Sequence, residues 1–263
     1  MLKRELKVNF KNFLIWLVLI IVLFLVIFLI YPSIISGDNA KAMDDMLKIF
    51  PKEVLATFNM DISSLDGVFG WFKSEGFVFI LLLTGCYAGI LGTNILLKEE
   101  SKKTIEYLNS LPITRNKIVL TKALAGFIYV IALIVGLTIF NYIALTISGD
   151  FNVKEFFLLS ISTGFSSSVI YFFCLFISTF THKSKKMLGI TLGIVFGSYI
   201  LYMFSTIAEE AEFLKYLSFF TLADVRNIIT DVAINPYMVL ITIVMSIVLL
   251  TLTLVHYNKK ELV

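Results

Sequence analysis

The sequence predicts an all-α membrane protein with six transmembrane helices. Of its 263 residues, 58% are hydrophobic and only 16% are charged, whereas a soluble domain is nearer half apolar and a quarter charged. The polar residues are gathered into short blocks between long apolar runs. Because backbone groups inside a bilayer must be hydrogen-bonded within the protein, these runs are expected to be helices.

Each apolar run reaches the roughly 20 residues that a helix needs to cross the hydrocarbon core. Tyr31-Pro32-Ser33 follows the first run without a small-residue cleavage pattern, so we interpret this run as a retained span and not as a signal peptide. The chain is expected to form one transmembrane domain over residues 1–263. Its spans are expected at residues 13–31, 77–97, 118–147, 156–180, 187–207 and 236–256.

Residues 1–12 precede the first span and have an amphipathic pattern. Leu2, Leu6 and Phe10 recur at four-residue spacing, and basic residues occupy the other faces. This pattern is typical of a helix that lies on an anionic membrane surface. A basic flank to the first span is the alternative.

The distribution of basic residues predicts the orientation of the chain. Six spans place both termini on one side of the membrane, and 15 of the 22 Lys and Arg residues fall on that side. The positive-inside rule makes this side cytoplasmic. The connection 98–117 is then also cytoplasmic, and the loops 32–76 and 208–235 are extracellular.

The connection 98–117 is the longest polar interruption between two apolar runs, and it has a helical pattern of its own. Glu99, Glu100 and Glu106 are expected to face solvent, and Pro112 is expected to end the helix because a proline disfavours helical geometry in the residue before it. A short amphipathic helix here is suited to contact with a partner protein; a solvated loop with some helix is the alternative. The apolar flank consists of Ile105, Tyr107, Leu108 and Leu111.

The sequence contains no pattern that indicates catalysis. It has no phosphate-binding G-x-x-x-x-G-K-[ST] loop, no G-x-S-x-G and no H-E-x-x-H. Its two cysteines and two histidines are scattered, so no metal site is expected. The spans hold almost no ionisable residues at mid-depth, which disfavours ion-coupled transport.

Small and polar residues inside the spans have two possible roles. The polar ones could line a path through the membrane, although such residues more often allow helices to pack closely; they are Asn94, Asn141, Ser162 and Ser166. The glycines at four-residue spacing could pack within the chain or form a dimer face; they are Gly85 and Gly89 in the second span and Gly189, Gly193 and Gly197 in the fifth.

Residues 99–115 resemble the signature of the ABC type-2 permeases, the membrane subunits of ATP-binding-cassette exporters. The family has glycine where this chain has Lys103. Two weaker resemblances follow in the right order, at residues 216–220 and 257–262, so the likeness extends over essentially the whole chain. The matching residues are Glu99-Glu100 and then Lys103-Thr104-Ile105-Glu106-Tyr107-Leu108-Asn109-Ser110-Leu111-Pro112-Ile113-Thr114-Arg115.

The resemblance implies an architecture and a set of site residues. Residues 1–12 would be an N-terminal interfacial elbow helix, and 98–117 would hold a cytoplasmic coupling helix that fits a groove of an ABC ATPase subunit. Two permease copies, identical or sister chains, would pair near the fifth span. The implied coupling residues are Glu99, Glu100 and Glu106 for charge contacts, Ile105, Tyr107, Leu108 and Leu111 for apolar anchoring, Thr104 and Pro112 from the motif, and Arg115 for ATPase acids or lipid phosphate.

The implied function is that of a multi-pass exporter subunit in the plasma membrane, with both termini cytoplasmic. ATP and Mg²⁺ would bind the partner ATPase, and this chain would bind no cofactor and no nucleic acid. The apolar spans suit an amphipathic or hydrophobic substrate, such as a peptide toxin or an antimicrobial peptide. The alternative is a non-transporting membrane scaffold or sensor that recruits a cytoplasmic partner through the same helix; a membrane-embedded enzyme is disfavoured because no catalytic constellation is present.

Overall fold

The computed structural model describes residues 1–34, 49, 67–101, 113–182, 184–207 and 209–260, and within them it contains helices and no strand. Six helices are long and apolar enough to cross a membrane, which confirms the predicted number and order of spans. These are α1 (Leu2–Ile34), α5 (Phe77–Ser101), α7 (Arg115–Ser148), α8 (Val153–Ser178), α9 (Ser184–Ile207) and α11 (Pro236–Lys259).

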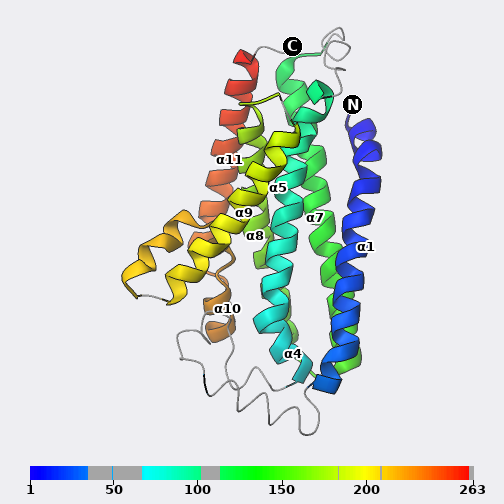
Figure 1. Ribbon diagram of the computed structural model, residues 1–263, viewed down its shortest axis with the longest axis vertical. Coiled ribbons are helices and arrows are strands. Elements are labelled where there is room, and N and C mark those ends of the chain that lie inside the picture. The colour runs from blue at the N-terminus through cyan, green and yellow to red at the C-terminus, as the bar shows by residue number, and fades with distance from the viewer. Residues whose placement is uncertain (35–48, 50–66, 102–112, 183, 208, 261–263) are drawn as a thin grey trace.

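The two ends of the bundle differ in composition (Figure 1). The N-terminus, the C-terminal end of α11, the C-terminal end of α5 and the first turns of α7 lie together at one end. We call this the charged end, defined by Glu5, Lys98, Glu99, Glu100, Lys122 and Lys260. The opposite end, where α4 (Gly67–Trp71) lies, is the aromatic end, defined by Phe24, Phe28, Trp71, Phe72, Phe151 and Phe156.

Helix α5 is the central element of the bundle. It packs most extensively on α8 and also contacts α7 and α9, whereas α1 packs mainly on α7. Close packing of α5 on α8 depends on Gly92, because a Cβ there would collide with the backbone carbonyl oxygen of Tyr171. The Tyr171 hydroxyl in turn donates a hydrogen bond of 2.9 Å to the carbonyl oxygen of Ala123 on α7.

The first helix differs from the expectation of a surface helix at 1–12 followed by a span at 13–31. The structure has one continuous helix, α1, from Leu2 to Ile34. Leu2, Leu6 and Phe13 pack against the protein core, and the Tyr129 hydroxyl donates a hydrogen bond to the carbonyl oxygen of Leu6. Leu2 and Leu6, which were assigned to the membrane surface, therefore face the protein, whereas Phe10 is exposed. A separate elbow helix is not confirmed.

The spans also extend beyond their predicted limits at the charged end. Helix α5 continues to Ser101, α7 begins at Arg115 and α11 continues to Lys259. Hydropathy places a boundary at the first charged residues, whereas in α5 the charged residues Glu99 and Glu100 are buried inside the protein. At the other end, α4 and a π-helical turn, η2 (Phe72–Gly76), precede α5 within the predicted loop 32–76.

The predicted loop 208–235 is largely helical. It contains two 3₁₀ helices, η3 (Glu209–Leu217) and η4 (Phe219–Ala223), and a short helix, α10 (Val225–Asp231). Helix η3 runs back alongside α9, and the pair leaves the side of the bundle partway along its length (Figure 1). The Ser218 hydroxyl donates a 2.7 Å hydrogen bond to the carbonyl oxygen of Ser198, which fixes the turn between η3 and η4 against α9.

Candidate functional site at the charged end

The last turn of α5 carries three successive charged residues, Lys98, Glu99 and Glu100. Both glutamates are buried, with 9% and 6% of their surface exposed. Successive residues on a helix point about 100° apart, so the two carboxylates face different neighbours. Each is compensated by a cation from a distant part of the chain.

Glu99 belongs to a cluster that joins α5 to α7 and α1. The Lys122 ammonium lies 2.5 Å from Glu99 Oε2 and 3.5 Å from Glu5 Oε1, and it donates a 3.0 Å hydrogen bond to the carbonyl oxygen of Ile95. Lys98 lies 2.5 Å from the other oxygen of Glu5. Two acids and two bases therefore balance in one cluster, and Lys122 is only 1% exposed.

Glu100 belongs to a second cluster that joins α5 to the turn after α8 and to the C-terminal segment. Lys260 Nζ lies 3.0 and 2.8 Å from the two oxygens of Glu100 and donates a 2.7 Å hydrogen bond to the carbonyl oxygen of Thr181. His182 Nδ1 lies 2.8 Å from Glu100 Oε2. Arg115 donates to the carbonyl oxygen of Lys260 at 2.8 Å, so the start of α7 is attached to the same segment.

These ion pairs fix geometry more than they add stability. Desolvation of buried charges offsets much of their attraction, yet removal of one partner leaves an uncompensated buried charge and costs about 3–5 kcal/mol. The favourable arrangement is therefore one in which all partners are in place. As a result, the last turn of α5 is held in register with α1, α7, the turn at 181–182 and the end of α11.

The structure corrects one expectation about the site residues. Glu99 and Glu100 were expected to face solvent, but both are buried and ion-paired. Their partners Lys122 and Lys260 lie 23 and 160 positions away along the chain, beyond the reach of a local helical pattern. Arg115 is bound to backbone carbonyls of the C-terminal segment. Most of the predicted coupling residues lie outside the described residues, namely Thr104, Ile105, Glu106, Tyr107, Leu108, Leu111 and Pro112.

Sequence reasoning missed five members of these clusters: Glu5, Lys98, Lys122, His182 and Lys260. Two of them carried a usable signal. Glu5 is the only acid among four bases in the first 12 residues, and Lys122 is the only charged residue in the predicted span 118–147. An isolated charge next to a span is a candidate for burial with a partner.

The predicted packing glycines fall into two groups. A Cβ on Gly85 would lie 3.2 Å from the Phe220 ring, and one on Gly89 would lie 2.8 Å from Thr191 Cγ2, so these two positions serve packing inside the chain. The three glycines of α9 behave differently, because a Cβ there would have no neighbour within 4 Å among the described residues. These are Gly189, Gly193 and Gly197.

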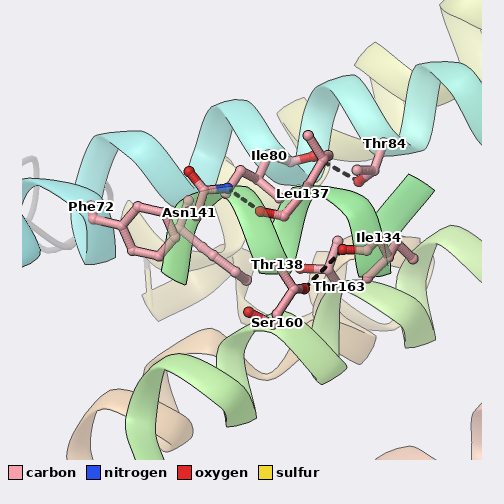
Figure 2. Close-up of a pocket in the computed structure, with 10 residues that line it drawn as sticks. Phe72, Ile80, Thr84, Ile134, Leu137, Thr138, Asn141, Ser160 and Thr163 are labelled. Atoms are coloured by element: carbon pink, nitrogen blue, oxygen red, sulfur yellow. Dashed lines mark hydrogen bonds between the residues drawn. The ribbon is translucent and has the colours of Figure 1, made fainter. Parts of the chain in front are cut away.

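Of the four predicted path residues, Asn141 lines a cavity that Asn94, Ser162 and Ser166 do not line. Ser162 and Ser166 are buried and donate to carbonyl oxygens of their own helix. Asn94 is partly buried on α5. Asn141 lines a small cavity of its own, at a distance from the charged end (Figure 2). Among the described residues, no group of His, Cys, Asp or Glu is arranged to hold a metal ion.

A comparison with protein families decides what kind of protein carries these clusters. The model of the ABC-2 family transporter protein matches residues 1–262. The chain belongs to this ABC-2 family. Its members are membrane subunits of transporters, and they generally work with a separate ATP-binding subunit. Comparison with curated proteins and with solved structures finds no significant match.

The family assignment confirms the resemblance to the ABC type-2 permeases that was expected over essentially the whole chain. An ABC-2 subunit is not itself catalytic, and no nucleotide-binding domain is evident in this chain. The buried clusters therefore lie in a transport permease, on both sides of the connection that carries the family motif.

Proposed function

We propose that this chain is the permease subunit of an ABC exporter that moves an amphipathic or hydrophobic substrate out of the cell. The proposed cargo is a peptide such as a toxin or an antimicrobial peptide, and the energy comes from ATP hydrolysed with Mg²⁺ on a separate subunit. The observation that carries the proposal is the attachment of the last turn of α5. The family motif begins in this turn, and buried ion pairs connect it to α1, α7 and the C-terminal segment.

These contacts suggest how movement of the ATPase would reach the spans. In the proposal, residues 98–117 hold a coupling helix that fits a groove of the ATPase. When two ATPase subunits close on ATP, this helix is displaced. Glu99 and Glu100 are ion-paired to Lys122 and Lys260. For this reason the C-terminal end of α5, the first turns of α7 and the C-terminal end of α11 move together, and the spans rock as rigid units.

The orientation and the assembly form part of the proposal. The charged end faces the cytoplasm because most basic residues lie there, and the protein resides in the plasma membrane. A second permease copy, identical or a sister chain, packs against α9. The glycine face of α9, which has no neighbour among the described residues, suits the close approach of another helix.

The peptide-like cargo is supported by where charges occur in the described helices. The ion-paired residues of the spans lie near the charged end, apart from the pair Lys73–Glu155 close to the aromatic end. Between them, the spans present apolar and hydroxyl side chains, which suit an amphipathic molecule better than a small ion.

The alternative is a membrane scaffold or sensor that recruits a cytoplasmic partner through residues 98–117 without transport. Both functions predict a bound partner. Only transport predicts that the ATPase activity of this partner responds to a substrate. The scaffold predicts that the partner binds and that its activity does not change when a peptide is added.

The deciding experiment is purification of the tagged protein in mild detergent together with its ATPase, followed by an ATPase assay with and without an amphipathic cationic peptide. We expect the ATPase to copurify and its rate to change with the peptide. Tyr107→Ala is expected to abolish the response and to leave membrane insertion intact. Tyr237→Ala is the control, because Tyr237 is 71% exposed at the start of α11, away from the connection 98–117. An unchanged response in Tyr107→Ala would contradict the proposed coupling.

A further inference from the structure

A small cavity lies between α5, α7 and α8, in the half of the bundle nearer the aromatic end (Figure 2). Its polar lining consists of Thr84, Thr138, Asn141, Ser160 and Thr163. Its volume of about 10 Å³ is close to the minimum that a single water-sized species requires. The cavity is therefore too small for a peptide.

All five polar side chains donate a hydrogen bond to the carbonyl oxygen four residues earlier in their own helix. The donor–acceptor distances lie between 2.6 and 3.2 Å. Once its proton is directed along its own helix, a hydroxyl group offers the cavity only the lone pairs of its oxygen. The pairs are Thr84 with Ile80, Thr138 with Ile134, Asn141 with Leu137, Ser160 with Phe156, and Thr163 with Leu159.

Asn141 adds the strongest acceptor. Its side-chain nitrogen donates to Leu137 at 2.9 Å, while its amide oxygen Oδ1 is buried and has no hydrogen-bond partner among the described residues. The whole residue is 1% exposed. Figure 2 shows Asn141 reaching from α7 toward α5 and Phe72, while Thr138, Ser160 and Thr163 lie between α7 and α8. Buried amide oxygens are rarely left without a partner, because this costs free energy.

We propose that this cavity binds one small electropositive species, either a water molecule that donates hydrogen bonds or a dehydrated alkali cation such as Na⁺. The lining favours this class because it presents oxygen acceptors and no basic side chain. Phe72 and Phe77 form part of the apolar wall. The inference does not depend on transport, since binding belongs to the isolated permease.

The test compares two variants of the cavity lining with one control variant in lipid nanodiscs. Asn141→Leu removes the unpaired oxygen at similar volume, and Thr138→Val removes a lining hydroxyl. Thr251→Val is the control, because Thr251 bonds to its own helix in the same way but is exposed on α11. The melting temperature is measured as NaCl replaces choline chloride at constant ionic strength, and a high-resolution structure of the wild-type protein is determined.

Two outcomes support the proposal and separate the two ligands. If Na⁺ is bound, the melting temperature of the wild type and of Thr251→Val rises with the logarithm of the Na⁺ concentration, and the rise is lost in Asn141→Leu and reduced in Thr138→Val. If water is bound, the melting temperature is independent of Na⁺, and the structure shows density within hydrogen-bonding distance of Asn141 Oδ1. Absence of both the Na⁺ dependence and the density would overturn the proposal.

Discussion

The charged end and the aromatic end hold the same helices together by different forces. At the charged end, α5 is joined to its neighbours by short ion pairs such as Glu99–Lys122 and Glu100–Lys260. At the aromatic end, rings pack together: Trp71 lies 6.3 Å from Phe24, and Phe156 lies 5.6 Å from Phe72, between ring centroids. One ion pair, Lys73–Glu155 at 3.2 Å, supplements these rings.

The difference matters for movement. A buried ion pair has one favourable geometry, and separation of its partners leaves charges without compensation. Aromatic clusters are held by non-directional burial of apolar surface and by weak ring–ring preferences, so they tolerate small displacements. The charged end is thus suited to hold the helices in register, and the aromatic end is suited to repack when they tilt.

The largest expected effect is that of Lys122→Met. The substitution keeps the volume of the side chain but leaves Glu99 buried without its cation, so the stability should fall by about 3–5 kcal/mol. The measurement is unfolding in detergent by titration with a denaturing surfactant. Lys117→Met is the control, because Lys117 is exposed on the same helix. The double variant Lys122→Met/Glu99→Gln should recover much of the loss, and a loss that persists in full would contradict a charge effect.

A smaller loss is expected for Lys260→Met. Glu100 would lose its ammonium partner but keep its contact with His182, so the expected cost is about 1–3 kcal/mol, the range for a buried acceptor that loses its partner. The same unfolding assay measures it. Lys259→Met changes the neighbouring residue, which is exposed, and should have little effect. Equal effects of the two substitutions would show that Lys260 is not held by Glu100.

The aromatic end should tolerate a conservative change better. Phe156 is fully buried and packs on Phe72, Tyr142 and Phe151. Phe156→Leu keeps an apolar side chain and should cost about 1–2 kcal/mol, from imperfect packing and lost ring contacts. Phe157→Leu is the control, since Phe157 is 43% exposed. If Phe156→Leu lowered the free energy of unfolding more than Lys122→Met does, the aromatic end would be the less tolerant one, contrary to the comparison.

The smallest expected effect depends on pH and concerns Asp224, in the turn between η4 and α10. Burial raises the pKa of the Asp224 carboxyl above its ordinary value of 3.8. A raised pKa means that the protonated form is favoured in the folded state, so the contribution of Asp224 to stability falls as the pH rises from about 4 through the folded-state pKa. The backbone φ of +48° also suits asparagine.

Asp224→Asn should therefore match the wild type in stability near pH 4 and be slightly more stable at neutral pH. The gain should stay within the roughly 0.5 kcal/mol common for substitutions near a surface. Melting temperatures across this pH range measure it. Asp150→Asn, an exposed acid between α7 and α8, serves as the control. If the stability gain of Asp224→Asn over the wild type grew as the pH fell, the predicted direction of the pH dependence would be wrong.

The amino-acid sequence by itself determined the class of the fold. The length and polarity of the apolar runs predicted six helices in the right order, because a helix in a bilayer satisfies its backbone hydrogen bonds locally. The start of α1, the end of α5, the start of α7 and the end of α11 lie at one end of the bundle, as an even number of spans requires. The family motif at 99–115 was also visible in the sequence, because its residues are adjacent along the chain.

Only the tertiary structure decided which residues meet. In the sequence, Glu99 and Glu100 have the pattern of the exposed start of a helix within residues 98–117. Their burial depends on Lys122 of α7 and on Lys260, which follows α11. The continuity of α1 likewise depends on α7, which covers the apolar face of its first turns. The same holds for glycines, since Gly89 and Gly193 have the same local spacing, yet only Gly89 is covered by a neighbouring helix. Contacts between distant segments are not encoded in local periodicity, so the sequence pattern alone left them open.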